Sequence, residues 1–199
     1  MVEAMEAMKP GPSSERMHKL GHFQGGEWVE HVHPAVYEVS PPGGANQRVV
    51  AGVPRGDPEV FGSLVASLAP PLHLLYVLHT PRGEGAAGRY QTPALGAEDV
   101  HAFLTRFSSF LSADARFDIW AHSPGDGATV VWDRHNQVFA YGPLTRFEFV
   151  LQRLGFERGS VEMPSPHQHH YRAEFDEEAS GVLHAFAWRH TPLQDGDEQ

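Results

Sequence analysis

The chain has 199 residues, of which 41% are apolar and 20% charged, and its formal net charge at pH 7 is −10. This length and apolar fraction favour one folded domain and exclude a chain that is disordered throughout. The lack of cysteine excludes disulfides, iron–sulfur clusters and thiolate zinc sites. An acidic chain without a run of Lys or Arg also matches nucleic acid and anionic membranes poorly, so we expect neither as a partner.

The two ends of the chain differ in composition from the part between them. Residues 1–25 contain a Lys-Pro-Gly-Pro-Ser-Ser run and no apolar stripe, so we expect a mobile N-terminal arm there. Residues 191–199 are expected to form a loose acidic tail, and residues 26–190 a single α+β domain. The N-terminus lacks the apolar core of a signal peptide, and no stretch reaches the length of a membrane helix, so we expect a cytoplasmic protein.

Two short strands and a helix are predicted in the first third of the chain. The strands fall at residues 28–33 and 47–53. The helix begins after them, because Asp57 is a good N-cap and Pro58 suits the first helical position. Apolar residues recur at helical spacing along it: Val60, Phe61, Leu64, Val65 and Leu68.

A buried strand and a second helix are expected next. Residues 72–78 read LHLLYVL, which is typical of a strand covered on both faces. The second helix is predicted over 97–111, where the apolar spacing is that of a helix buried on one side. Its stripe consists of Val100, Phe103, Leu104, Phe107 and Leu111.

Residues 116–141 predict a meander of three strands. Residues 116–122 alternate between apolar and polar, and the segments 128–132 and 138–141 are joined by a short turn rich in Asp and Asn. Four large aromatic side chains on this meander either pack against the helices or form a surface for a partner: Trp120, Trp132, Phe139 and Tyr141.

The last predicted elements are helices at residues 142–155 and 173–188, with a weak strand at 157–163 between them. The meander interrupts the alternation of strands and helices that a doubly wound parallel sheet requires. We therefore predict an α+β fold with a mixed or mainly antiparallel sheet, about four helices packed on it, and the three-strand meander.

The loop at residues 81–95 is long and rich in glycine. Gly83 to Gly88 match the string G-x-G-x-x-G, but Pro93 disfavours the helix that a dinucleotide site needs directly after it. Two readings remain for this loop, an ordinary surface excursion or a binding loop. In the second reading, Arg82, Arg89 and Tyr90 would meet an anionic ligand.

The chain contains 14 histidines, and two pairs have the spacing His-x-His. Residues i and i+2 of a strand point to the same side, so each pair could reach one metal ion. The pairs are far apart in sequence and nothing links them, so no metal site and no cofactor are expected, with a divalent transition metal as the alternative. The candidate ligands in that case are His31, His33, His167 and His169, with His122, Asp133 and His135 as a second cluster.

These observations favour a small binding or regulatory module over an enzyme. Its partner would be another protein, for which a basic one matches the charge, or a small ligand. The alternative is a metal-dependent hydrolase or oxygenase that uses histidines and carboxylates. The sequence indicates no oligomeric state and no substrate.

Overall fold

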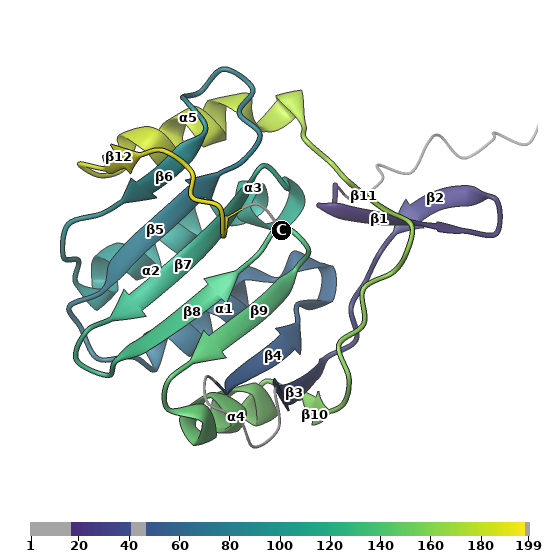
Figure 1. Ribbon diagram of the computed structural model, residues 1–199, viewed down its shortest axis with the longest axis horizontal. Coiled ribbons are helices and arrows are strands. Elements are labelled where there is room, and N and C mark those ends of the chain that lie inside the picture. Colours follow the sequence, from purple (N-terminus) through teal and green to yellow (C-terminus); the bar gives the residue numbers. More distant parts are fainter. Residues whose placement is uncertain (1–16, 41–46, 198–199) are drawn as a thin grey trace, which may run out of the picture.

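The computed structural model describes residues 17–40 and 47–197, and these residues form a nine-stranded sheet, a three-stranded sheet and five α-helices (Figure 1). The strand order across the large sheet is β10 (Glu157–Arg158), β3 (Val36–Ser40), β4 (Arg48–Gly52), β9 (Gln137–Tyr141), β8 (Ala128–Trp132), β7 (Phe117–Ser123), β5 (His73–Leu78), β6 (Gly88–Gln91) and β12 (Arg189–Thr191). Neighbouring strands are antiparallel except for β10 and β3, which are parallel.

Helices cover one face of this sheet, the face turned away from the viewer in Figure 1. They are α1 (Pro58–Ala66), α2 (Ala97–Arg106), α3 (Ser108–Ala113), α4 (Leu144–Arg153) and α5 (Asp176–His184). Short 3₁₀ turns precede α1 and α5, at η1 (Pro54–Gly56) and η2 (Ala173–Phe175). The predicted N-cap is confirmed, because the Asp57 side chain accepts a hydrogen bond from the backbone N–H of Glu59 at 3.0 Å.

The core lies between the sheet and the helices. One row of paired residues crosses five central strands on this face, and all five side chains are buried: Ala51, Val138, Trp132, Ile119 and Tyr76. The alternation of each strand places the neighbouring residues on the opposite face, which none of the five described helices covers. That open face is crossed by the chain after α5, drawn in yellow in Figure 1.

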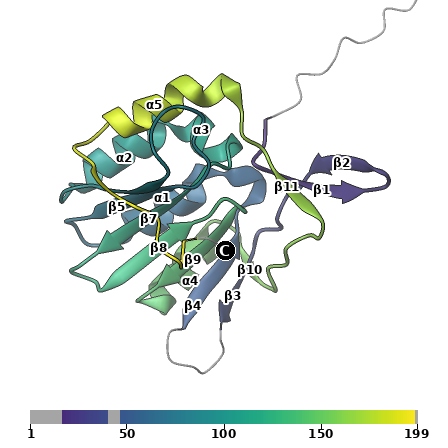
Figure 2. The ribbon, with the colours of Figure 1, turned by 45° about the horizontal axis from the view of Figure 1, so that its top comes forward.

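A small second sheet stands at the edge of the large one. It consists of β1 (Leu20–Gln24), β2 (Glu27–Glu30) and β11 (His167–His169), in the order β11-β1-β2. Figure 2 shows the β1–β2 hairpin projecting beyond the large sheet, with β11 alongside it. Leu20 is fully buried at the base of this hairpin, which ties the small sheet to the rest of the molecule.

The predicted α+β class and the antiparallel meander β7-β8-β9 are confirmed. The second helix differs from its prediction, because it breaks at Phe107 into α2 and α3. Phe107 has φ −102° and ψ 14°, outside helical values. Beyond the break, Phe110 and Leu111 of α3 both lie in the core, where each is 0% exposed.

The ends of the described chain are more ordered than the composition predicts. Residues 20–24 fall within the expected arm but form β1, because pairing with β2 and β11 supplies what the local sequence lacks. Residues 191–197 fall within the expected tail. There, Asp197 is nearly buried and pairs with Arg89 at 3.0 Å, which holds the segment against the sheet. Most of the expected arm, residues 1–16, lies outside the described residues, as do residues 198–199.

No helix in the described ranges has both the length and the apolar character needed to cross a membrane.

Candidate metal centre

His135 lies at the tip of the β8–β9 hairpin, in a turn that Asp133 organises. One carboxylate oxygen of Asp133 accepts hydrogen bonds from the backbone N–H groups of His135, at 3.0 Å, and Gln137, at 2.8 Å. Asn136 has a φ of 56°, a left-handed conformation that Asn tolerates better than most residues. These short polar side chains fix the point at which the His135 ring leaves the turn.

His167 and His169 reach the same place from β11. This strand pairs antiparallel with β1, with Leu20 opposite His169. The pairing extends by one residue, because the backbone N–H of His170 donates to the carbonyl of Lys19 at 2.8 Å. Alternate residues of a strand point to the same side, so both imidazoles leave β11 in one direction.

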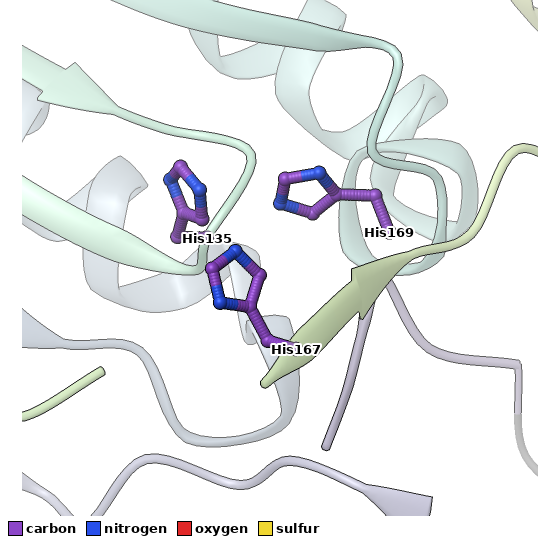
Figure 3. A group of neighbouring side chains, drawn as sticks. All are labelled: His135, His167 and His169. Atoms are coloured by element: carbon purple, nitrogen blue, oxygen red, sulfur yellow. The ribbon is translucent and has the colours of Figure 1, made fainter. Parts of the chain in front are cut away.

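The three imidazoles converge between the turn and the strand (Figure 3). One ring nitrogen from each of His135, His167 and His169 lies within 4.8 Å of the other two. The ring centroids are 4.7 Å apart for His135 and His169, and 5.4 Å apart for the other two pairs. Zinc-bound nitrogens in a tetrahedral site lie about 3.4 Å apart, so small rotations of these rings would close them on one ion.

Contacts outside the three rings fix the orientation of two of them. His135 Nδ1 lies 2.9 Å from an oxygen of Asp133, and His167 Nδ1 lies 3.0 Å from the carbonyl oxygen of Pro164. Each Nδ1 must donate in such a contact, which leaves Nε2 with a lone pair for a metal ion. The Nε2 of His169 is buried and has no hydrogen-bond partner among the residues that the structure describes. This nitrogen is therefore not engaged by those residues and could take part in binding a metal ion.

The electrostatic surroundings keep His169 in the neutral form that binds metal. Burial is the main reason that the pKa of His169 falls to about 3, and the neighbouring His135 and Arg134 act in the same direction. A metal ion therefore meets no competition from a proton at this ring near neutral pH.

His33 lies beside the three converging histidines without joining them. Its Nε2 donates to the backbone carbonyl of His135 at 2.9 Å, beneath the hairpin turn. Gly52 makes room for this contact, because a Cβ at that position would lie 2.6 Å from the Cβ of His33. Burial lowers the pKa of His33, although the bond to the His135 carbonyl opposes the shift. Its role in this geometry is to hold the turn.

His31 lies beyond His33 and faces the small sheet. Its Nε2 is 3.4 Å from His33 Nδ1, and its ring centroid is 5.2 Å from that of His22. Burial lowers the pKa of His31 to about 4. Among residues 17–40 and 47–197, His135, His167 and His169 form the only group of three or more possible ligands that converges this closely. Of the first predicted set of ligands, His167 and His169 therefore belong to the group, and His31 and His33 do not.

The second predicted set is divided as well. His122 is exposed on β7, where its Nδ1 lies 3.0 Å from the hydroxyl of Thr129. Asp133 and His135 do lie together, with Asp133 holding the ring of His135. The structure thus joins His135 of one set to His167 and His169 of the other.

The residues predicted for an anionic ligand at the glycine-rich loop each have a partner within the protein. Arg82 pairs with Asp176 at 3.0 Å, and Arg89 pairs with Asp197 at 3.0 Å. The hydroxyl of Tyr90 donates to the carbonyl of Ala86 at 2.7 Å. The glycine string runs into strand β6 and not into a helix, so it lacks the helix N-terminus that binds a pyrophosphate.

A cleft of about 340 Å³ opens beside His135 on the uncovered face of the sheet. Arg48 and Trp120 line it, together with Asp133 and His135. The sequence did not single out Arg48, because its role depends on the pairing of β4 with β9. The alternation of residues 116–122 does place Trp120 on the face opposite the core, so the sequence contains a signal that Trp120 could line a surface site.

Comparisons of this chain with protein-family models, with curated proteins and with solved structures find no match.

Proposed function

We propose that this protein binds one divalent transition-metal ion through His135, His167 and His169, and that the ion takes part in binding a small ligand. The observation that carries the proposal is the convergence of three imidazole nitrogens within 4.8 Å. Two of the rings are oriented by Asp133 and by the carbonyl of Pro164, as metal-bound histidines are in general.

Zinc is the first candidate among the metals. Imidazole suits zinc, copper, iron and nickel, and the lack of a cysteine removes the ligand that soft ions prefer. Three protein ligands with a fourth position open is the arrangement of sites at which zinc binds water or a substrate, whereas structural zinc sites have four protein ligands. This argument favours a metal centre that works on or holds a small molecule.

The test is a zinc titration of protein made without a His-tag or nickel column and dialysed against a chelator. We expect one zinc ion per chain, bound in competition with a chromogenic chelator. His167→Ala should weaken zinc binding by at least about tenfold, since it removes one ligand of three. His101→Ala is the matched control, because His101 is exposed on α2, and it should leave the affinity unchanged.

Two further variants separate this site from its alternatives. Asp133→Asn keeps an acceptor for the turn but removes the charge that orients His135, so we expect a loss of about 10-fold to 100-fold in zinc affinity. His31→Ala should have little effect, because His31 lies outside the group. Equal losses in His31→Ala and His167→Ala, or no stoichiometric zinc in the wild type, would contradict the proposal.

A metal-dependent hydrolase is the second candidate. The open fourth position favours it, because zinc with three protein ligands lowers the pKa of a bound water to about 7. The test is a panel of activated carboxylic and phosphoric esters, assayed with zinc-loaded wild type and with His167→Ala. A hydrolysis rate that requires both zinc and His167 would support the hydrolase. Zinc binding without such a rate would contradict the hydrolase and support metal binding only.

A further inference from the structure

The cleft beside the metal centre has walls of a different chemistry from the metal site. Its floor is the open face of β7, β8, β9 and β4, and residues 196–197 form part of its rim. The side chains of Arg48, Trp120, Val131, Phe139 and His135 are the parts of its lining that decide what it can bind.

The middle of the floor is largely apolar. Trp120 pairs with Val131, and Val131 pairs with Phe139, so these three side chains form one row across β7, β8 and β9. A second row follows about 7 Å along the strands, where Tyr141 is paired with Thr129 and with Arg48. Aromatic side chains in such rows offer stacking surface to a planar group.

The carboxylates of the cleft are all satisfied by the protein. Both oxygens of Asp118, of Asp133 and of Asp197 accept hydrogen bonds at 3.0 Å or less. Asp118 accepts from the ring of His79 and the backbone of Arg134. Asp133 accepts from the backbone and ring of His135 and from the backbone of Gln137. Asp197 accepts from Arg89 and from the backbone of Gln194. These acids are therefore engaged in holding the cleft and are poor candidates for binding a cation.

Two donors in the lining have no acceptor within residues 17–40 and 47–197. They are the buried Nε of Arg48 and the buried Nε1 of Trp120. The guanidinium of Arg48 stands 5.3 Å from the ring centroid of Phe139 and 5.8 Å from that of Tyr141, and it makes no ion pair with the residues that the structure describes. A buried donor without an acceptor is unfavourable, so the cleft lacks an acceptor at both points.

We propose that this cleft binds a small molecule with a planar apolar body and an anionic group, the anion facing Arg48 and the body lying over Trp120, Val131 and Phe139. A modest rotation of the Arg48 guanidinium would bring its donors onto a carboxylate or sulfonate, for which its planar fork is well matched. His135 lies at the other end of the same cleft, so the ligand approaches the metal centre with its opposite end.

The probe is biphenyl-4-carboxylate, with biphenyl-4-carboxamide as the uncharged control of the same shape. Binding is followed in ¹H–¹⁵N spectra by the indole N–H signal of Trp120, assigned with Trp120→Phe. We expect the carboxylate to shift this signal and to bind at least tenfold more tightly than the carboxamide, because a hydrogen bond to a charged group outweighs one to a neutral group.

Arg48→Gln should weaken carboxylate binding about tenfold or more and bring it to the level of the carboxamide. Arg153→Gln is the matched control, since Arg153 is exposed on α4, which covers the opposite face of the sheet, and does not line the cleft. Equal binding of the two probes to the wild type would overturn the proposal, as would the absence of any Trp120 shift at several millimolar probe. The comparison of probes uses wild-type protein, so it stands even where Arg48→Gln fails to fold.

This proposal does not require the metal. The titration is therefore run on chelator-treated protein and on zinc-saturated protein. Carboxylate binding without any zinc binding would support the proposed ligand cleft and contradict the metal centre. Zinc binding without carboxylate binding would support the metal centre and contradict the ligand cleft.

Discussion

Arg116→Ala is expected to lower the free energy of unfolding by about 3–5 kcal/mol, the usual cost of breaking a buried ion pair by removing one partner. Arg116 is 0% exposed and binds both oxygens of Asp114, with Nε at 2.8 Å and Nη2 at 2.9 Å. Its other contacts are Glu84 at 3.1 Å, Asp176 at 3.1 Å and the carbonyl of Arg172 at 2.9 Å. The variant would leave the buried carboxylate of Asp114 without its counter-ion.

The effect is large because this arginine joins segments that are distant in sequence. From the connection between α3 and β7, where Asp114 also lies, it reaches the glycine-rich loop through Glu84 and the start of α5 through Asp176. Burial alone would lower the pKa of Arg116, but the hydrogen bonds and charge of Asp114 and Glu84 raise it above its usual value, so the guanidinium stays charged.

Thermal and urea unfolding measure this prediction. A loss of 3–5 kcal/mol corresponds to a fall in Tm of roughly 6–20 °C for a chain of this size. Arg153→Ala is the control, because Arg153 is exposed and its variant should change stability by less than about 0.5 kcal/mol. A loss below about 1 kcal/mol for Arg116→Ala would show that the cluster contributes little.

Local patterns were sufficient to predict the central part of the fold. The stripe of α1 and the alternation in β7 are properties of consecutive residues, and each is confirmed. Strands β1, β11 and β12 were not predicted, because their stability comes from partners far along the chain. The segment 167–169 reads His-Gln-His, which has no apolar alternation, and it becomes a strand only by pairing with β1.

The candidate metal centre illustrates the same limit. The spacing of His167 and His169 was sufficient to predict that both side chains point to one side if the segment is extended. Their third partner could not be predicted, because His135 reaches them only through the placement of β11 beside the β8–β9 turn. Likewise, the period of two places Trp120 on the face of β7 opposite Ile119, but only the register that pairs Ile119 with Trp132 puts Trp132 on the buried face.

Lys19 carries the other large electrostatic effect in the molecule. It is 0% exposed, with Nζ 3.9 Å from the ring centroid of Trp132 and 4.9 Å from that of Phe117. Nζ has no hydrogen-bond partner in the part of the chain that the structure describes. Burial is the cause that lowers the pKa of Lys19 from 10.5 to about 7, against the opposing attraction of Asp133 and Asp118.

This pKa difference makes stability depend on pH in one direction. The unfolded chain keeps its proton on Lys19 up to about pH 10.5, whereas the folded chain releases it near pH 7. Between these values the unfolded state binds more protons, so the free energy of unfolding rises with pH across the window. Below about pH 7 both states are protonated, and the folded state bears the full cost of a buried charge.

We therefore expect Lys19→Met, which keeps the length of the side chain without its charge, to be more stable than the wild type at pH 6–7 by a few kcal/mol, at about 1.4 kcal/mol per pKa unit. The difference between the two proteins should shrink as the pH approaches 10. Urea unfolding at a series of pH values, in the presence of a chelator, measures it, and Lys19→Arg serves as the variant that keeps the charge and gains nothing. Every other titrating group is shared by the two proteins, so parallel curves of stability against pH would mean that Lys19 keeps its ordinary pKa. A Met variant less stable than the wild type would mean that the attraction of the acids and of Trp132 outweighs the cost of burying the charge.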